Sequence, residues 1–176
     1  MSQVLFTALV VAVGLERVAE LVVSRRNAAW SFARGGVESG RGHYPVMVLL
    51  HSGLLVAMLV EAWVRRPDVA PLLAWSMLAL VLASQALRWW CIATLGRQWN
   101  TRVIVVPGMA PVRRGPYTVL PHPNYVAVVL EGIALPLVHA CWITAVVFTV
   151  LNAVLLTVRI RVENTALATL SEPTRA

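Results

Sequence analysis

The chain has 176 residues, of which 59% are hydrophobic and only 13% are charged. Soluble domains have about 25% charged residues, so this composition excludes an ordinary soluble domain and favours one compact unit within a membrane. The net charge is +7 and all 15 basic residues are arginine, but they lie at the ends of apolar runs, where they face lipid headgroups rather than nucleic acid. Cys91 and Cys141 lie in apolar context and form no spaced framework, so neither a disulfide nor a metal site is expected.

Five segments are apolar enough for membrane-spanning helices, which need ~20 mostly apolar residues. They are 3–23, 44–64, 69–95, 124–138 and the stretch that begins at Cys141. The N-terminus lacks a basic n-region and a small-residue cleavage site, so it is expected to be a retained span rather than a signal peptide. The last two segments are nearly contiguous and are expected to form a tight antiparallel hairpin. The sequence therefore predicts an all-α integral membrane protein of about five transmembrane helices, folded as a single domain over residues 1–176.

Arginine placement orients these helices, because cytoplasmic loops carry the excess of basic residues. The two long loops and the region before the C-terminus hold most of the arginines, whereas the opposite side has Arg65 and Arg66. We therefore expect a multi-pass protein of the plasma membrane with its N-terminus outside. Both long loops and the C-terminus are expected in the cytoplasm.

The two long loops differ in character. The first is Gly-rich and amphipathic, and its Trp30 and Phe32 are suited to the membrane interface. The second contains a β-branched run, 101–106, followed by Pro107-Gly108 as a turn. This pattern predicts a short hairpin or an extended lid on the cytoplasmic side.

Ionisable side chains at membrane depth are costly and by default indicate function. Glu16 and Glu20 share one face of the first predicted helix. They either present two carboxylates to a cavity or pair with Arg17 or Arg88, and the sequence leaves both interpretations open. His51, in the second predicted helix, is expected to form an interhelical hydrogen bond.

Glu131 lies well inside the fourth predicted helix, with no basic residue within one turn. One interpretation is a protonated carboxyl that is hydrogen-bonded to a neighbouring helix. The other, which we favour, is a carboxyl that accepts a proton or contacts the substrate.

Asn152, Arg159 and Glu163 are separated by seven and four residues, so they align on one face of the fifth predicted helix. An ion pair at a helix end is one explanation of this spacing. However, the hairpin brings this face to the start of the preceding helix, where His122 and Tyr125 lie. A cavity there suits a zwitterionic, partly aromatic cofactor better than a metal ion, which requires clustered ligands.

The segment "GPYTVLPHPNY" followed by "RIRVEN" resembles the isoprenylcysteine carboxyl methyltransferase family, integral-membrane enzymes that depend on S-adenosylmethionine. The family signature is Gly-x-Tyr, four residues, then His-Pro-x-Tyr at the start of a helix, with Arg-x-x-x-Glu on the helix that returns. The matching positions are Gly115, Tyr117, His122, Pro123, Tyr125, Arg159 and Glu163. The resemblance implies that 96–176 is the cofactor-binding half, preceded by three helices in 1–95.

The resemblance also implies roles for the matched side chains. Arg159 is expected to face the methyl acceptor, and the strand-like segment that ends at Val112 is expected to lie over the cofactor. Two departures matter: Pro121 stands where the family commonly has Arg, and Glu163 is followed by Asn164 where the family often has a run of acids. Glu163 is thus the only carboxylate left for the cofactor. The residues expected to line S-adenosylmethionine are Val112, Tyr117, His122, Pro123, Asn124, Tyr125 and Glu163.

The N-terminal half, with "ERVAELVVSRRN" and "WNTRVIVVPG", is similar to small membrane O-methyltransferases associated with bacterial type III polyketide synthases, which act on alkylresorcinols or alkylpyrones. The implied function is O-methylation of a membrane-embedded acceptor with such a head or with a prenylcysteine-like carboxylate. Arg159 is the expected catalytic cation and Glu131 the expected base, with His43 or His51 as substitutes. By its helical angle Glu131 points away from His122, toward the acceptor side.

Two other functions remain open. A membrane reductase of related architecture would use NADPH, with Arg113 and Arg114 at its ribose phosphate, but the sequence has no Gly-rich dinucleotide turn. A small proton-coupled transporter would use Glu16, Glu20 and Glu131 as a proton relay, and it gives the His-Pro-Asn-Tyr motif no purpose. Membrane lipids and a lipophilic small molecule are the expected partners, and the oligomeric state stays open.

Overall fold

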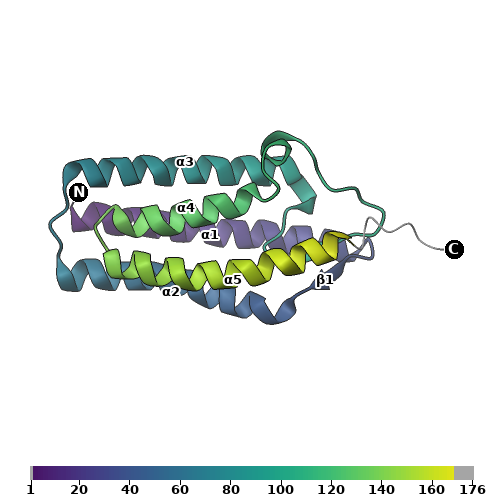
Figure 1. Cartoon of the computed structure of the whole chain (residues 1–176), viewed down its shortest axis with the longest axis horizontal. Coiled ribbons are helices and arrows are strands. Elements are labelled where there is room, and N and C mark those ends of the chain that lie inside the picture. Colours follow the sequence, from purple (N-terminus) through teal and green to yellow (C-terminus); the bar gives the residue numbers. More distant parts are fainter. Residues whose placement is uncertain (1, 169–176) are drawn as a thin grey trace.

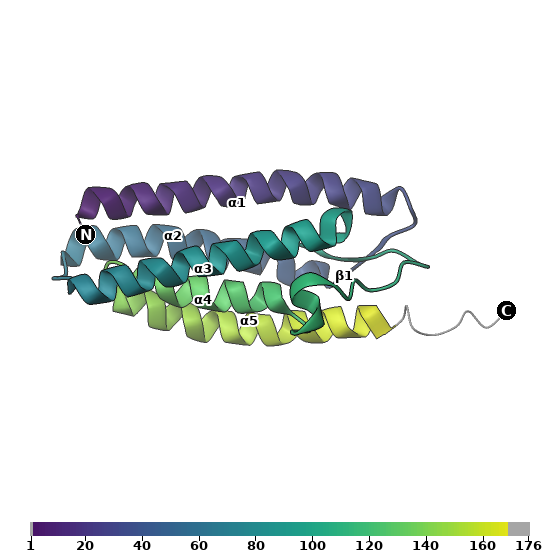
Figure 2. The ribbon, with the colours of Figure 1, turned by 90° about the horizontal axis from the view of Figure 1, so that it is seen from above.

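Five long helices lie along one axis in the computed structural model, which describes residues 2–168 (Figure 1 and Figure 2). The N-terminus, the α2–α3 loop and the α4–α5 turn lie at one end of this bundle, and the two long loops lie at the other. Residue 1 and residues 169–176, which the predicted domain and C-terminal tail include, lie outside the described residues. The helices are α1 (Gln3–Phe32), α2 (Tyr44–Arg65), α3 (Pro71–Leu95), α4 (Pro123–Leu137) and α5 (Trp142–Ala168).

Short elements occupy the long loops. They are the strands β1 (Val37–Ser39) and β2 (Val103–Val105) and the 3₁₀ helices η1 (Arg41–His43), η2 (Gly96–Gln98) and η3 (Gly115–Thr118). Proline stands in the first turn of α2, α3 and α4, where its fixed φ favours a helix start and its missing N–H has no intrahelical acceptor. These prolines explain why the sequence predicts the starts of α2 to α4 closely.

Three described segments are long and apolar enough to cross a membrane by length and composition: Arg41–Arg65, Pro71–Gln98 and Trp142–Ala168. The chain is thus a multi-pass membrane protein, and the count of five spans stays a prediction. α4 is apolar but has only 15 residues. Such a helix rises ~22 Å, less than the ~30 Å of a hydrocarbon core. Figure 1 shows that α4 is shorter than α1 and α5 on the side of the long loops, so its N-terminus lies within the bundle and not at its end.

α1 is longer than the predicted segment 3–23 and continues through Phe32. Trp30, expected in an interfacial loop, is therefore part of this helix. The added turns are held by the second long loop: the side-chain amide of Asn27 donates to the carbonyl oxygens of Gly96, at 3.1 Å, and Trp99, at 2.7 Å. Local hydropathy does not detect such long-range support.

The β-branched run 101–106 contains a strand, but it does not form the local hairpin that the Pro107-Gly108 turn predicts. β2 instead pairs antiparallel with β1 of the first long loop, with Glu38 opposite Ile104. Both loops meet at the same end of the bundle, and the residues after the turn include prolines, which cannot donate to a ladder. The extended lid is thus a two-loop structure.

The tight α4–α5 turn is fixed by α2. The Glu61 carboxylate accepts hydrogen bonds from the backbone N–H groups of Ile143, at 3.1 Å, and Thr144, at 2.8 Å. The Thr144 hydroxyl donates to the same carboxylate at 2.7 Å. An anion placed at the N-terminus of α5 satisfies donors that a helix start leaves without partners.

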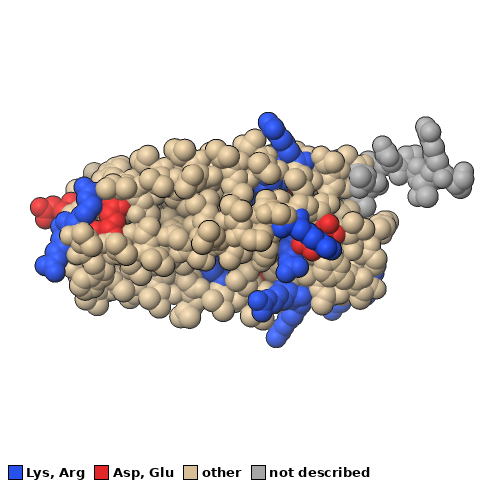
Figure 3. Space-filling view, turned by 90° about the horizontal axis from the view of Figure 1, so that it is seen from below, with Lys and Arg blue, Asp and Glu red and all other residues tan. Residues whose placement is uncertain are grey.

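The apolar core lies in the half of the bundle away from the long loops. Gly132 of α4 has no side chain, which lets the Phe148 ring approach the α4 backbone. Large apolar side chains also cover the outside of the helices, while charged groups lie mainly toward the two ends (Figure 3). The core residues include Phe6, Met58, Val81, Leu135, Val138 and Phe148.

Candidate active site

The ends of α4 and α5 and the two-loop lid enclose a cavity of about 200 Å³, here named the loop-side cavity. β2 and the following segment to Val112 form one wall, and the first turn of α4 forms another. Pro123, also expected to contact the cofactor, is fully buried and does not line the cavity. The predicted site residues that line it are Val112, Tyr117, His122, Asn124, Tyr125, Arg159 and Glu163.

Four of these side chains form one hydrogen-bonded cluster. Arg159 Nε donates to the Tyr125 hydroxyl at 2.9 Å, and that hydroxyl donates to Glu163. His122 stacks on the Tyr125 ring with 5.3 Å between centroids, and its Nδ1 lies 3.6 Å from the Glu163 carboxylate. In the part of the chain that the structure describes, Arg159 and Glu163 form no direct ion pair. The Tyr125 hydroxyl bridges them instead, so the spacing on α5 is not explained by a simple pair at a helix end.

Two residues of the second long loop, His122 and Tyr117, have shifted pKa values. Interaction with the Glu163 carboxylate raises the pKa of His122, against the effect of burial, and contact of its Nε2 with Asn164 Oδ1, at 3.0 Å, also raises it. Burial is the main reason why the pKa of Tyr117 is raised, so its hydroxyl stays protonated. The cavity therefore combines a proton-binding imidazole with a neutral phenol.

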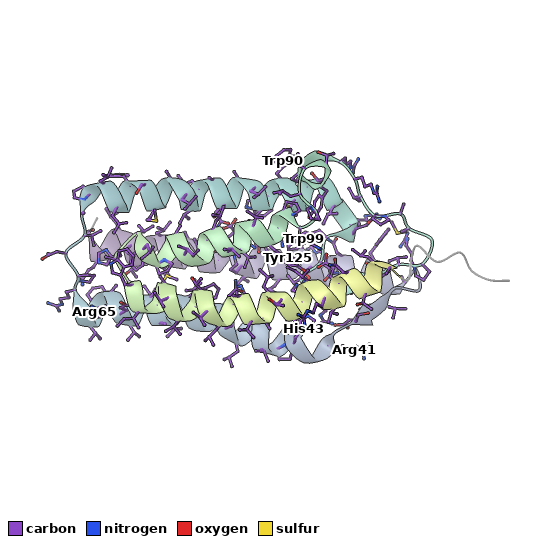
Figure 4. All side chains as sticks on the ribbon, in the orientation of Figure 1. Arg41, His43, Arg65, Trp90, Trp99 and Tyr125 are labelled. Atoms are coloured by element: carbon purple, nitrogen blue, oxygen red, sulfur yellow. The ribbon has the colours of Figure 1, made fainter. Side chains whose placement is uncertain are left out.

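A second cavity of about 170 Å³, here named the inter-helix cavity, lies mainly between α1, α2 and α5. Its walls are largely apolar, and Asn152 of the predicted α5 face also lines it. Five residues line both cavities, so the two adjoin at this boundary, where Figure 4 labels Trp99 and Tyr125. The boundary residues are Trp99, Asn100, Asn124, Tyr125 and Arg159. The more polar and the more apolar of the two cavities thus meet at Arg159.

A model of the isoprenylcysteine carboxyl methyltransferase (ICMT) family matches residues 75–169, more than half of the chain. The chain belongs to this family. It is also 36% identical over 164 residues to "Uncharacterized protein YpbQ" of Bacillus subtilis (strain 168), which covers 93% of this chain and 96% of that protein. No solved structure matches the chain. The ICMT resemblance of the motifs is confirmed, and the chain is a membrane methyltransferase by family. Its likeness to the polyketide-associated group stays a prediction.

The donor set of the loop-side cavity fits the cofactor that ICMT enzymes generally use, S-adenosylmethionine. Glu163 can accept hydrogen bonds from an ammonium group, and the tyrosine and histidine rings suit a cationic sulfur and an aromatic base. The valines and isoleucine of β2 add an apolar wall. Among the described residues no group of three or more His, Cys, Asp or Glu could hold a metal ion.

Glu131, the predicted base, does not face the acceptor side as its helical angle suggests. It is buried, lines neither cavity, and accepts a 2.6 Å hydrogen bond from Arg88 Nη2 of α3. Arg17 of α1 lies 3.7 Å from the same carboxylate. Both arginines come from other helices, so the residues within one turn of Glu131 in the sequence do not reveal them. These contacts give Glu131 a structural role, and its role as a base stays a prediction.

The acidic pair on α1 takes part in the same ionic network. Glu20 lies 2.8 Å from Arg17 and 3.7 Å from Arg88, and Glu16 lies 3.2 Å from Arg17. Of the two interpretations left open, pairing with these arginines is therefore present in the structure. Glu20 also lines the inter-helix cavity, together with Arg17 and Arg88.

The two histidines considered as substitute bases are placed differently. His51 lines the inter-helix cavity, whereas His43 lines neither cavity and lies in η1, below α5 in Figure 4. His51 Nδ1 contacts the Met47 carbonyl oxygen at 2.8 Å. A carbonyl only accepts, so Nδ1 carries the proton and a neutral His51 keeps its lone pair on Nε2.

Trp99 and Asn100 are boundary residues that the sequence analysis did not single out. They belong to the "WNTRV" segment, whose similarity to known methyltransferases was noted without a role for either side chain. A sequence signal was present: a tryptophan and an amide directly follow a long apolar helix. Arg88, one of few charges within that helix, is a second such signal.

Proposed function

We propose that the chain is an S-adenosylmethionine-dependent methyltransferase that methylates an oxygen of a lipophilic acceptor taken from the membrane. The observation that carries this proposal is that the loop-side cavity, the more polar of the two, meets the largely apolar inter-helix cavity at Arg159 and Tyr125. A water-soluble cofactor and a lipid tail need different chambers with one shared boundary. ICMT membership supports the same reaction class.

In this proposal the loop-side cavity holds the cofactor. Glu163 binds its ammonium group, and His122 and Tyr125 position that carboxylate through the contacts of the cluster. Tyr117 and Asn124 line the same chamber, and the β1–β2 lid covers it and excludes water. When bound, S-adenosylmethionine supplies a methyl group on a positively charged sulfur. The chain's own residues supply position and desolvation, which account for much of such a rate enhancement.

The acceptor lies in the inter-helix cavity with its oxygen at the boundary. Arg159, held by Tyr125, presents a cation that favours an acceptor oxyanion. The candidate acceptors are alkylresorcinol or alkylpyrone lipids and prenylcysteine-like carboxylates. A phenol has a pKa of ~10 and needs a base. His51 lines this cavity and is one candidate base. Glu131 does not line it, so Glu131 contacts the acceptor only through Arg88 or after a change in its own position.

The proposed orientation places the loop-side cavity in the cytoplasm and the N-terminus outside. Six arginines lie in the long loops at this end, Arg34, Arg41, Arg97, Arg102, Arg113 and Arg114, whereas Arg65 lies at the opposite end (Figure 4). Proteolysis or labelling of engineered sites in sealed vesicles tests this orientation.

Calorimetry on the purified protein in nanodiscs tests the cofactor. S-adenosylmethionine should bind in the micromolar range and NADPH should not. Glu163→Ala should weaken this binding, whereas Trp75→Phe, on the outside of α3, should not. Binding of NADPH would support a reductase, and failure of both ligands to bind would support a transporter. Either result would overturn the proposal. Labelled S-adenosylmethionine added to native membranes then identifies the methylated lipid.

A further inference from the structure

Buried polar atoms without hydrogen-bond partners gather at the boundary of the two cavities. Among the described side chains, Trp99 Nε1, Asn100 Nδ2 and Asn124 Oδ1 are buried and unpartnered. All three residues line both cavities. A buried unsatisfied polar group costs ~1–3 kcal/mol, so their concentration at one place indicates that a ligand satisfies them.

Two of these atoms are hydrogen-bond donors. An indole N–H only donates, and Trp99 is just 3% exposed. The orientation of the Asn100 amide is fixed, because its Oδ1 accepts from the backbone N–H of Arg102, at 3.3 Å. The Ser24 hydroxyl also donates to Oδ1, at 2.7 Å. Nδ2 is therefore the atom left without a partner, and it requires an acceptor.

The segment that carries these donors is held rigidly against α1. The backbone N–H of Thr101 donates to the Ser24 hydroxyl at 3.0 Å, and Asn27 donates to the Trp99 carbonyl at 2.7 Å. Donors fixed in this way are preorganised for a ligand, since little entropy is lost when it binds.

Arg159 adds, at the same boundary, a cation without a direct ion pair among the described residues. It is 6% exposed, and its side chain donates to the Tyr125 hydroxyl, at 2.9 Å, and to the Met47 sulfur, at 3.5 Å. In the described residues no carboxylate lies within ion-pair distance of its side chain. Buried charges are normally paired, so this cation requires an anion.

We propose that Trp99, Asn100 and Arg159 form the binding site for the acceptor head, an oxygen group that is anionic at neutral pH. A carboxylate or an acidic enol brings a negative charge for Arg159 and accepts from the two N–H donors, whereas a neutral phenol leaves the cation without an anion. The tail of the acceptor extends into the inter-helix cavity. This inference rests on the proposed function and names the acceptor class for that site.

Binding of three probes with tails of equal length tests the inference: hexadecanoate, a pentadecyl hydroxypyrone and pentadecylphenol. Saturable binding to the full chain in nanodiscs is measured at neutral pH, without any methyl transfer. An anionic probe should bind at least ~10-fold more tightly than the phenol, as expected for one charge-assisted hydrogen bond or more. The tighter of the two anionic probes identifies the head.

Two conservative variants test the donors. Asn100→Asp keeps an oxygen facing Arg102 but replaces the free donor with a negatively charged carboxylate oxygen, which also repels an anion. Trp99→Phe adds no charge and removes only the indole N–H donor and part of the ring. Both should weaken the anionic probe ~10-fold or more, and this loss should exceed any loss of affinity for S-adenosylmethionine, whose proposed cavity the two residues also line. Trp75→Phe, on the lipid-facing side of α3, is the matched control and should change neither.

The outcomes separate this inference from the proposed function. Failure of S-adenosylmethionine to bind overturns the proposed function. If it binds but no probe does, if the phenol binds as tightly as both anions, or if the two variants match the control, the acceptor assignment is wrong while the proposed function stands.

Discussion

Arg159 Nε of α5 donates a 2.9 Å hydrogen bond to the Tyr125 hydroxyl of α4, across 34 positions of sequence. The same hydroxyl donates to Glu163, so one oxygen atom links the cation at the boundary of the two cavities to the carboxylate in the loop-side cavity. Tyr125 therefore sets the positions of two charged side chains at once.

Tyr125→Phe keeps the ring that stacks on His122 but removes this shared hydroxyl. Arg159 and Glu163 then lose a common partner and are free to pair directly, which takes both from their positions in the cluster. We expect kcat/KM to fall ~10- to 100-fold, or ~1.4–2.7 kcal/mol of transition-state stabilisation. Labelled methyl transfer to native membrane lipids measures this effect. Equal activity in the variant and the wild-type protein would show that the hydroxyl does not position Arg159.

His122 makes cofactor binding dependent on pH. Because its pKa is raised by Glu163, its protonated form occupies the carboxylate that the cationic cofactor needs. We expect S-adenosylmethionine affinity to increase as pH rises through the raised pKa of His122, with release of a proton. His122→Gln should remove this dependence. Calorimetry in buffers of different ionisation enthalpy measures it, and an affinity that falls with rising pH would contradict it.

The same raised pKa has a consequence for stability. A group whose pKa is higher in the folded than in the unfolded state contributes stability below its unfolded value, and this contribution is lost as pH rises through the folded value. The cofactor-free protein should therefore lose the His122 contribution as pH rises through the raised folded-state pKa of this residue, and His122→Gln should flatten this part of the pH–stability curve. Thermal unfolding in nanodiscs measures both proteins.

Variants of Glu131 distinguish a structural ion pair with Arg88 from a role as the general base. Glu131→Leu leaves Arg88 without its closest anion, which should cost ~3–5 kcal/mol, whereas the double variant Arg88→Met, Glu131→Leu should recover most of this loss. Glu131→Gln, which keeps a hydrogen-bond acceptor, should lower stability while kcat of the folded protein stays within ~10-fold. A loss of kcat of ~100-fold or more without loss of stability would instead establish Glu131 as the base.

The two-loop lid predicts a selective effect on the cofactor. Ile104→Pro removes a backbone N–H and disrupts the pairing with Glu38, so we expect S-adenosylmethionine affinity to fall ~10-fold or more. Ile104→Thr, which keeps a β-branched strand residue, is the control and should retain most of the affinity. Thermal stability should change little in either variant, since the bundle core is at the other end. A lid that is irrelevant to the cofactor would leave both affinities equal to that of the wild-type protein.

Much of the site follows from local rules. Proline at the starts of α2 to α4, the nearly contiguous last two apolar segments and the spacing of Arg159 and Glu163 place His122 and Tyr125 opposite α5. The hairpin leaves few other arrangements, because a short turn forces antiparallel neighbours and helical periodicity selects the facing side chains. The family motifs occupy these same positions.

Tertiary structure alone decided the contacts between distant segments. Glu131 looked unpaired because its partner Arg88 lies on α3, 43 positions away. The run 101–106 looked like half of a hairpin because nothing local reveals that β1 is its partner. In both cases a residue's partner depends on which elements pack together, and hydropathy or spacing within one segment does not encode that choice.

The sequence by itself determined the membrane class, the helices and the cofactor-side motif, since apolar run length, proline placement and helical periodicity are local properties. Only the tertiary structure decided that Trp99 and Asn100 reach the boundary beside Arg159. Ser24 and Asn27 of α1 donate to the Asn100 side-chain oxygen and the Trp99 carbonyl oxygen, which leaves the Asn100 amide nitrogen and the Trp99 indole N–H without partners. That balance exists only when the second long loop is packed against the far end of α1.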